Sequence, residues 1–443
     1  MNIQLPEHIR EILSKIKNAG FEGYCVGGCV RDSILCREIN DWDVTTSASP
    51  DELCEIFSAY RIIPTGLQHG TITVVCQGKN VEITTYRVDG EYTDNRHPEN
   101  VSFTRSLSED LSRRDFTVNA MCYNDDDGLV DMYGGIQDLE NKIIRAVGDP
   151  DKRFNEDALR ILRALRFSSQ LGFKIEEKTE QAIFRNKELL KNISAERIAV
   201  ELKKLLCGKN VYYVMSHFAE VFFVIIPELQ CEYRHPQIGA KHAYDVWEHT
   251  CHTVDGIEAD EILRLTMLLH DCGKVKTEAF DEKGNSTFKN HAAEGGKIAN
   301  GILKNLKLDN RTIDLVTKLV SIHDMKVPTD KIAVKKYLSI TGVENFHRMM
   351  KIRKADRGAL SEGYNDISDL LEKAYVAFDE VMANNECYSQ NMLCVNGSDL
   401  TKIGIQGKAV GECLTILLDA VITEKIPNNR AELLNYCKSV YEK

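Results

Sequence analysis

The chain contains 443 residues, more than one hydrophobic core usually holds, so we expect two to four domains. A formal net charge of −11 argues against a protein that coats nucleic acid nonspecifically, although it permits a local basic groove. The 14 cysteines form no paired C-x-x-C motifs, which is typical of reduced thiols in a cytoplasmic protein rather than of a disulfide framework. The most apolar region, 211–229, is interrupted by charged residues and a proline, so it predicts core helices and no membrane span.

Helix and strand patterns alternate in the first part of the chain. Residues 5–19 predict an amphipathic helix, because Ile9, Ile12 and Ile16 fall on one face. Glu82 lies in a later strand pattern and is either a solvated residue or a third carboxylate for the site described next. Beyond residue 46, the patterns predict a helix over 51–58 and strands over 61–64, 71–76 and 81–85, the last two joined by a turn at 78–80.

The stretch from residue 24 to residue 46 carries the first candidate site. After a short strand, Gly27 and Gly28 let the backbone approach a bulky anion, and the helix start that follows offers free N–H groups to phosphate. Asp41 and Asp43 follow on a second strand, where alternate side chains share a face, so both carboxylates should enter one pocket. Two divalent cations about 3.5–4 Å apart, as in polymerases, would offset their repulsion. Each motif alone is a weak signal, but their order predicts a triphosphate held against metal ions.

This order, GGxVRD followed by DxDxxT, resembles the head of the tRNA nucleotidyltransferases and bacterial poly(A) polymerases. The resemblance implies a polymerase-β-like head with a mixed β-sheet and helices. It also implies that Asp41 and Asp43 are catalytic and hold Mg²⁺, and that Gly27, Gly28 and Arg31 bind the nucleotide.

A second motif, Arg113-Arg114-Asp115, offers guanidinium forks for phosphate and a carboxylate acceptor for a ribose hydroxyl. Taken alone, such a triplet is more often a salt bridge at a helix start. Its position matches the second motif of the same family, which implies that Arg114 meets the triphosphate, Asp115 meets the sugar and Asn119 also binds the nucleotide. Residues 87–103 predict a polar loop, and the resemblance implies a flexible loop that helps the site accept ATP after CTP, which disfavours an enzyme that adds only C.

The segment 156–167 predicts one helix with an apolar side and a basic side. Asp157 and Arg160 are three residues apart, so the plain interpretation is an intrahelical ion pair. However, an acceptor beside a donor matches the pairing edges of C and A and opposes those of U and G. The EDxxR motif has this base-selecting role in the family, and the resemblance extends the role to Asp157 and Arg160, with Arg163 and Arg166 also contacting the nucleotide.

The second half of the chain carries a different set of residues, His249, His270, Asp271 and Asp356. A lone His on a helix is more often a core residue, but imidazole and carboxylate in this order are typical metal ligands. The run that begins at His270 resembles the HDxGK signature of HD-domain metal phosphohydrolases. The resemblance implies a site for a divalent metal of unknown identity, where acidified water would attack phosphate esters.

Two further histidines, His291 and His323, leave three alternatives open. They complete a second metal site, they support the first site from outside, or they are plain surface imidazoles. The residues from 361 onward predict helices and resemble the region that touches the tRNA elbow in these proteins.

The resemblance covers roughly residues 20–230 and, separately, residues 245–360. It implies an α+β multidomain chain in which an all-helical neck, body, HD domain and tail follow the head. The expected domains are the nucleotidyltransferase head at 1–145, the neck and body with the base-reading helix at 146–235, the HD domain at 241–360 and a tRNA-contacting tail at 361–443.

The implied function is template-independent addition of C, C and A to the 3′ end of tRNA from CTP and ATP, with release of pyrophosphate by a two-metal mechanism. The expected partners are CTP, ATP and the acceptor stem and elbow of tRNA, with no membrane and no protein partner, and the HD domain would act in end repair. One alternative is an enzyme that adds only A, or a poly(A) polymerase. Another is an HD phosphohydrolase whose head binds RNA.

Overall fold

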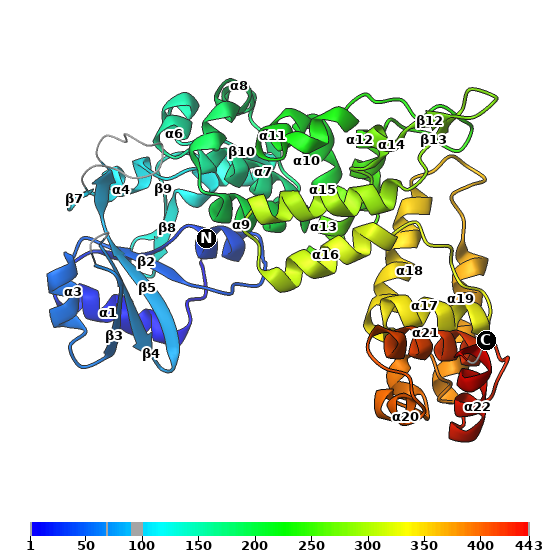
Figure 1. Ribbon diagram of the computed structural model, residues 1–443. Coiled ribbons are helices and arrows are strands. Elements are labelled where there is room, and N and C mark those ends of the chain that lie inside the picture. The colour runs from blue at the N-terminus through cyan, green and yellow to red at the C-terminus, as the bar shows by residue number, and fades with distance from the viewer. Residues whose placement is uncertain (1, 68–69, 90–100, 442–443) are drawn as a thin grey trace. The chain divides into compact units, whose positions relative to one another are not determined.

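The computed structural model describes residues 2–67, 70–89 and 101–441 (Figure 1). The chain divides into two compact units, the first formed by Met1–Gln230 and Ile302–Asp309, the second by Cys231–Gly301 and Asn310–Lys443. The expected division into four domains at 145, 235 and 360 stays a prediction. In the part of the chain that the structure describes, no helix is both long and apolar enough to span a membrane.

A mixed sheet of seven strands forms the head of the first unit, as predicted. Its central pair, β2 and β5, runs parallel, and the other neighbours run antiparallel. The order across the sheet is β3 (Arg61–Gly66), β4 (Thr71–Cys76), β5 (Lys79–Thr85), β2 (Asp43–Thr46), β1 (Gly23–Val26), β8 (Met121–Asn124) and β9 (Gly128–Asp131).

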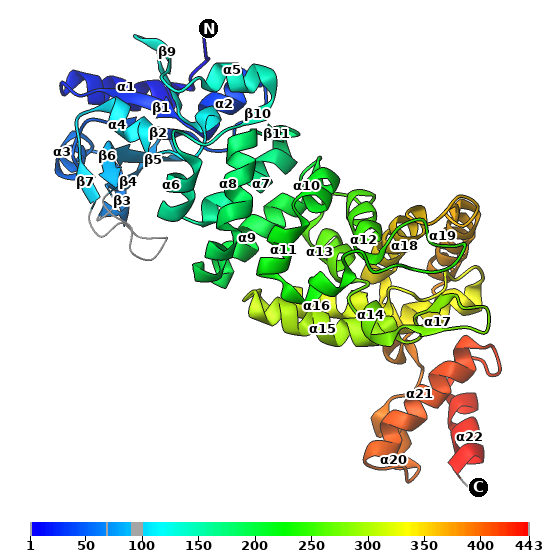
Figure 2. The ribbon, with the colours of Figure 1, turned by 90° about the horizontal axis from the view of Figure 1, so that it is seen from above.

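Helices α1 (Glu7–Asn18), α2 (Gly28–Ile34) and α3 (Pro50–Ile56) pack on this sheet; Figure 1 labels α1 and α3, and Figure 2 labels α2. The predicted apolar face of α1 is confirmed, since its isoleucines are buried. Ser49 and Glu52 form a reciprocal capping box that begins α3, with a proline at the first helical position.

The prediction of a loop over 87–103 is wrong at both ends, because β6 (Arg87–Asp89) and β7 (Val101–Phe103) form an antiparallel pair there. The centre of the predicted loop, residues 90–100, lies outside the described residues. Beyond β7 come α4 (Leu107–Ser112), the single turn η2 (Thr117–Asn119), α5 (Gly135–Asn141) and the two-residue strand β10 (Ile143–Ile144).

The helical part of the first unit follows the head, and Figure 2 shows α7 to α11 gathered there. Strand β10 pairs with β11 (Lys174–Ile175), and the turn η3 (Lys187–Asn192) lies among the helices. The helices are α6 (Pro150–Glu156), α7 (Leu159–Leu171), α8 (Glu177–Asn186), α9 (Ala195–Leu206), α10 (Val211–His217) and α11 (Ala219–Ile225).

The expectation of one helix over 156–167 is wrong, because the chain breaks between α6 and α7. Asp157 is extended, with φ −138° and ψ 103°, and its Oδ1 accepts a hydrogen bond from the backbone N–H of Leu159 at 3.1 Å. A short polar side chain that caps backbone donors in this way favours a helix start over a helix interior.

The second unit is helical apart from the short β12 (Ala279–Phe280) and β13 (Ser286–Thr287) pair. Figure 2 shows α20 to α22 grouped near the C-terminus. After the turn η4 (Pro227–Glu232), the helices are α12 (Val246–Asp255), α13 (Glu261–Leu269), α14 (Lys274–Thr277), α15 (His291–Asn305), α16 (Asn310–Ile322), α17 (Lys331–Thr341), α18 (Val343–Gly358), α19 (Ser368–Ala383), α20 (Gly397–Lys402), α21 (Lys408–Ile422) and α22 (Arg430–Tyr441), with the turn η5 (Gln390–Met392) before α20.

A disulfide joins Cys413 of α21 to Cys437 of α22. The other twelve cysteines, all within the described residues, are the expected reduced thiols, but the expectation does not extend to this pair. Both cysteines belong to the apolar core of the three C-terminal helices, and packing brings them together across 24 residues of sequence. Composition and spacing carry no trace of such a contact.

Candidate active site and metal centre

The predicted head residues converge on a cavity of about 440 Å³ in the first unit. Its walls come from the glycine turn before α2, the start of β2, the segment after α4 and one face of α7. The lining residues are Gly27, Gly28, Cys29, Arg31, Asp32, Glu38, Ile39, Asn40, Asp41, Asp43, Arg114, Asp115, Asn119, Arg163, Arg166 and Phe167.

Asp41 and Asp43 share this cavity, although not for the predicted reason. Strand β2 begins at Asp43, so Asp41 precedes it and the alternation of a strand does not align the pair. Glu82 lies opposite Asp43 in the parallel register. Desolvation and the charges of Glu82 and Asp41 raise the pKa of Asp43, and Arg114 opposes them. Crowded carboxylates that repel one another are a donor set that fits hard divalent cations such as Mg²⁺.

The glycine turn lets the backbone pass close to a charged side chain. Gly27 has φ +80°, and a Cβ there would lie 3.4 Å from Nη1 of Arg114. Arg31 is buried and donates from Nη1 to Oδ1 of Asn119 at 2.7 Å, and it also pairs with Asp32. The guanidinium groups of Arg31 and Arg114 therefore both reach the cavity from fixed positions.

Asp115 is held as an ionised carboxylate inside the cavity wall. Its Oδ2 accepts from Nε and Nη2 of Arg163 at 2.8 and 2.6 Å, and its Oδ1 accepts from Nδ2 of Asn119 at 3.3 Å. Burial opposes ionisation, but the charge and hydrogen bonds of Arg163 outweigh it and lower the pKa of Asp115 to about 2. The motif after α4 and the face of α7 are joined by this bidentate pair.

The two expected base-reading side chains are not paired with each other. Oδ2 of Asp157 accepts from Nη2 of Arg197 at 2.8 Å, whereas Nη1 of Arg160 donates to Glu156 at 2.7 Å. Among the described residues, those that line the cavity include neither Asp157 nor Arg160. Their role in base selection stays a prediction.

Phe167 and Glu201 complete the arginine face of α7, and sequence reasoning missed both. The Phe167 ring centroid lies 4.4 Å from the guanidinium carbon of Arg166 and 5.1 Å from that of Arg31. Glu201 on α9 is buried and pairs with Nε of Arg166 at 3.1 Å. The only sequence signal was an acidic residue in the apolar pattern of α9, where a buried charge requires a partner.

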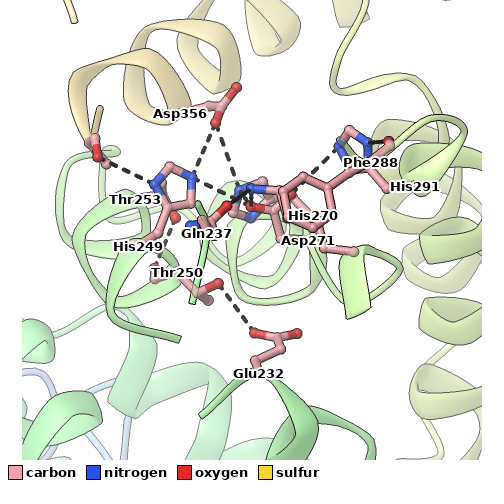
Figure 3. A network of polar contacts seen from close by, with 12 residues as sticks. Glu232, Gln237, His249, Thr250, Thr253, His270, Asp271, Phe288, His291 and Asp356 are labelled. Carbon is pink, nitrogen blue, oxygen red and sulfur yellow. Dashed lines mark hydrogen bonds and ion pairs between the residues drawn. The ribbon is translucent and has the colours of Figure 1, made fainter. Parts of the chain in front are cut away.

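A second site lies in the other unit, where the four predicted ligands meet (Figure 3). Nε2 of His249 lies 3.5 Å from Oδ2 of Asp271 and 3.3 Å from Oδ1 of Asp356. Nε2 of His270 lies 3.0 Å from Oδ2 of Asp271. These side chains come from α12, from the end of α13 and from α18, so three separate helices deliver one cluster.

The two histidines left open in the sequence join this cluster. Nε2 of His291 and of His323 lie 3.1 Å apart, and 3.6 and 3.7 Å from Oδ1 of Asp271. Burial, followed by the charge of His270, lowers the pKa of His323 to about 3, so this imidazole stays neutral. The alternative of surface imidazoles is therefore wrong for His323, which is 1% exposed.

The distances and donor atoms of the cluster fit a metal-binding site. Two groups bring ligand atoms within 4.8 Å of one another, namely His249, His270 and Asp271, and Asp271, His291 and His323. Among the described residues, Nε2 of buried His270 makes no hydrogen bond of good geometry, although it lies 3.0 Å from Oδ2 of Asp271. Each δ-nitrogen of His270, His291 and His323 is close to a backbone carbonyl, which leaves the ε-nitrogens free to coordinate.

Comparison with known proteins agrees with this architecture. The Poly A polymerase head domain matches residues 23–145, the RNA and SrmB-binding site of polymerase A matches 172–230, and tRNA nucleotidyltransferase domain 2 matches 292–437. The CCA-adding enzyme of Lactiplantibacillus plantarum is 33% identical over 445 residues, covering 99% of this chain and 98% of that protein. That of Lactobacillus helveticus is 54% identical over 199 residues, about half of each chain.

A solved structure extends the likeness to three dimensions. The CCA-adding enzyme of Bacillus stearothermophilus, solved in complex with CTP, is 28% identical and superposes with a TM-score of 0.73, covering 99% of this chain and 98% of that chain. The fold and the acidic, arginine-lined cavity define a nucleotidyltransferase with a polymerase-type head. Within that class, the chain belongs to the family of CCA-adding enzymes.

Proposed function

We propose that this chain adds C, C and A to the 3′ end of tRNA from CTP and ATP, without a nucleic-acid template. The observation that carries the proposal is the cavity that gathers Asp41, Asp43, Arg114 and the Asp115–Arg163 pair. Full-length similarity to CCA-adding enzymes, one of them solved with CTP, supports it.

In the proposed reaction, the 3′-hydroxyl of tRNA attacks the α-phosphorus of the nucleotide. The bond between the α-phosphorus and the oxygen that bridges to the β-phosphate breaks, and pyrophosphate leaves with the bonding electron pair. Asp41 and Asp43, with Glu82 as a third carboxylate beside them, would hold divalent cations. When bound, such cations favour ionisation of the hydroxyl and stabilise charge on the leaving group. Arg31 and Arg114 bind the triphosphate, and Asp115, fixed by Arg163, accepts from the ribose.

The base is selected, in this proposal, by Asp157 and Arg160 together. An acceptor beside a donor complements C and A, whereas U or G would leave buried polar groups facing like groups, at about 1–3 kcal/mol per group. Arg197 already holds one oxygen of Asp157, and Glu156 holds Arg160, so each side chain has an anchor that limits its motion.

The test is an incorporation assay with three tRNAs that end before CCA, after C and after CC. We expect CTP to extend the first two and ATP to extend only the third. D43A should abolish all incorporation, because it removes a metal-binding carboxylate. D157A should retain incorporation but lose discrimination against UTP and GTP by about tenfold or more, as expected for a lost hydrogen bond to a base edge.

The outcomes separate the alternatives. Extension of the third tRNA alone would identify an A-adding enzyme, and a long A tail on any RNA would identify a poly(A) polymerase. If D157A selects bases as well as the wild type does, Asp157 does not read the base.

A second function is favoured by the cluster in the other unit. We infer that its His and Asp side chains form an HD-type metal centre that hydrolyses phosphate esters in tRNA end repair. His249, His270, Asp271 and Asp356 would hold one divalent cation, and His291 and His323 with Asp271 a second. A bound cation there supplies Lewis acidity for attack of water on phosphorus.

The test is hydrolysis of a 2′,3′-cyclic nucleotide by the full chain with added Mn²⁺, Co²⁺ or Ni²⁺. H270A should lose the activity, whereas the control H217A, an exposed histidine that pairs with Glu180, should keep it. No hydrolysis by the wild type with any of these metals would contradict this second function.

The tRNA-binding role of 361–443 and a cytoplasmic location are further parts of the proposal.

A further inference from the structure

Asp110, near the end of α4, is a buried carboxylate that sequence reasoning did not single out. Its Oδ2 accepts from Oγ1 of Thr45 at 3.1 Å and from Nη2 of Arg114 at 3.2 Å. Its Oδ1 accepts from Nε and Nη2 of Arg113 at 3.0 and 2.6 Å. The side chain is fully buried, and an ionised carboxylate persists in such a place only when donors surround it.

The two donors to Oδ2 come from different elements of the head, Thr45 from strand β2 and Arg114 from the segment after α4. Thr45 lies two residues after Asp43 on β2, so both side chains project from the same face of that strand. Arg114 lines the cavity together with Asp43. One carboxylate oxygen therefore connects the strand that carries a proposed metal ligand to the arginine that faces it.

Arg114 depends on this contact. Among the described residues, the side chain of Arg114 makes one hydrogen bond, from Nη2 to Asp110, and its buried Nε has no partner. Nη1 lies beside Gly27 at the cavity. A long arginine side chain has many rotamers and loses conformational entropy when it is fixed, so an unanchored Arg114 would sample other rotamers.

We propose that Asp110 is a positioning residue for nucleotide binding, which fixes Arg114 against the β2 strand so that its free Nη1 meets the triphosphate. The inference rests on the proposed nucleotidyl transfer, because that function supplies the triphosphate. Asp110 itself touches no substrate.

The experiment compares the binding of ATP and of AMP to the full chain by titration calorimetry. In D110N the amide keeps the size of the side chain but loses the charge, and its NH2 group replaces one of the two acceptor oxygens that Arg113 and Arg114 use. ATP affinity should fall by about tenfold or more, the usual range for a lost charge-assisted contact, while AMP affinity stays within about twofold. In the assay with CTP and tRNA, KM for CTP should rise while KM for tRNA does not change.

The matched control is D138N. Asp138 is a buried carboxylate of the same head that also accepts from a threonine, Thr117 at 2.6 Å, and from an arginine, Arg145 at 3.1 Å, outside the residues that line the cavity. D138N should cost comparable stability without changing the ratio of ATP to AMP affinity. If D138N lowers that ratio as much as D110N does, or if D110N leaves it unchanged, the proposal is overturned.

Two further variants test the same contact if the D110N protein does not fold. T45V removes one donor to Asp110 and should lower the ATP affinity in the same direction by a smaller factor. In an R114A background, T45V should have no further effect on ATP affinity, because the anchored group is gone; independent effects would contradict the coupling. A wild type that binds ATP over AMP but extends no tRNA would refute the proposed function and leave this test of Asp110 intact.

Discussion

At the scale of single residues, two carboxylates in one cavity have opposite electrostatic environments. Asp115 faces Arg163 and Asn119, which lower its pKa, whereas Asp43 faces Glu82 and Asp41, which raise its pKa. The first arrangement is satisfied within the protein, whereas the second leaves carboxylates crowded together, as the proposed cation site requires. Groups whose surroundings push their pKa values apart are typical of sites with separate chemical roles.

The Asp115–Arg163 pair should make stability depend on pH. Because the folded-state pKa of Asp115 is lowered to about 2, ionised Asp115 stabilises the fold above the unfolded pKa of about 3.9, and this contribution is lost as the pH falls toward 2. D115N should therefore cost about 2 kcal/mol at pH 7 and progressively less below pH 4. Urea unfolding at pH 7, 4 and 3 measures the difference.

The control for this prediction is D151N, which breaks an exposed pair. Asp151 and Arg185 have side chains that are 41% and 55% exposed, so solvent screens their attraction. D151N should cost less than about 1 kcal/mol at any of these pH values. A cost for D115N that is equal at pH 7 and pH 3 would show that packing, not charge, is lost.

At the scale of elements, the helix pair α7 and α9 supports the arginine face of the cavity. Glu201 of α9 pairs with Arg166, and Arg197 of α9 pairs with Asp157 just before α7. The two helices also approach each other closely at their ends. A Cβ on Gly208, just after α9, would lie 2.0 Å from Oγ of Ser169 at the end of α7. The arginines that line the cavity thus depend on how tightly these two helices meet.

G208A should therefore destabilise the protein. The added methyl group overlaps Ser169, and overpacking of this kind costs about 1–3 kcal/mol. The matched control is G301A in α15, where a Cβ meets nothing within 4 Å, so the exchange should be neutral or stabilise by up to about 1 kcal/mol. Thermal unfolding followed by circular dichroism compares the two; equal midpoints would disprove the close approach.

At the scale of the whole molecule, each of the two compact units carries its own charged site. The cavity of acidic and arginine side chains belongs to the first unit, and the histidine–aspartate cluster to the second. A formal net charge of −11 coexists with this basic cavity face because the arginines are gathered locally. Two sites with different donor sets should respond independently to mutation.

Metal analysis of purified variants tests this independence. D271N should lose the metal of the proposed HD-type centre, because Asp271 belongs to both candidate ligand groups, and should retain the proposed nucleotide addition within about twofold. D43N should show the reverse, with metal retained after dialysis and no nucleotide addition. Loss of both properties in either variant would mean that the sites are coupled.

Only some of the residues of the site could be predicted from the sequence. The acidic pair, the glycine turn and the Arg114–Asp115 motif reach one cavity as expected, since each is a local signature on a short segment. The sequence did not show that Asp157 lies at a helix break, nor that Asp110, Glu201 and Phe167 support the arginines. Those relations join segments that are far apart in the chain.

The sequence by itself determined the classes of element and the chemistry of each motif. Apolar spacing set α1, the alternating runs set the strands, and residue type decided which groups accept, donate or bind metal. Only the tertiary structure decided the partners: Arg163 pairs with Asp115 and not with its own helix, and six candidate metal ligands share one cluster, with His270 and Asp271 at the end of one helix and the others on or beside different helices. The physical reason is that propensity and periodicity act over a few residues, whereas a buried charge selects its partner from whatever the packed core brings near.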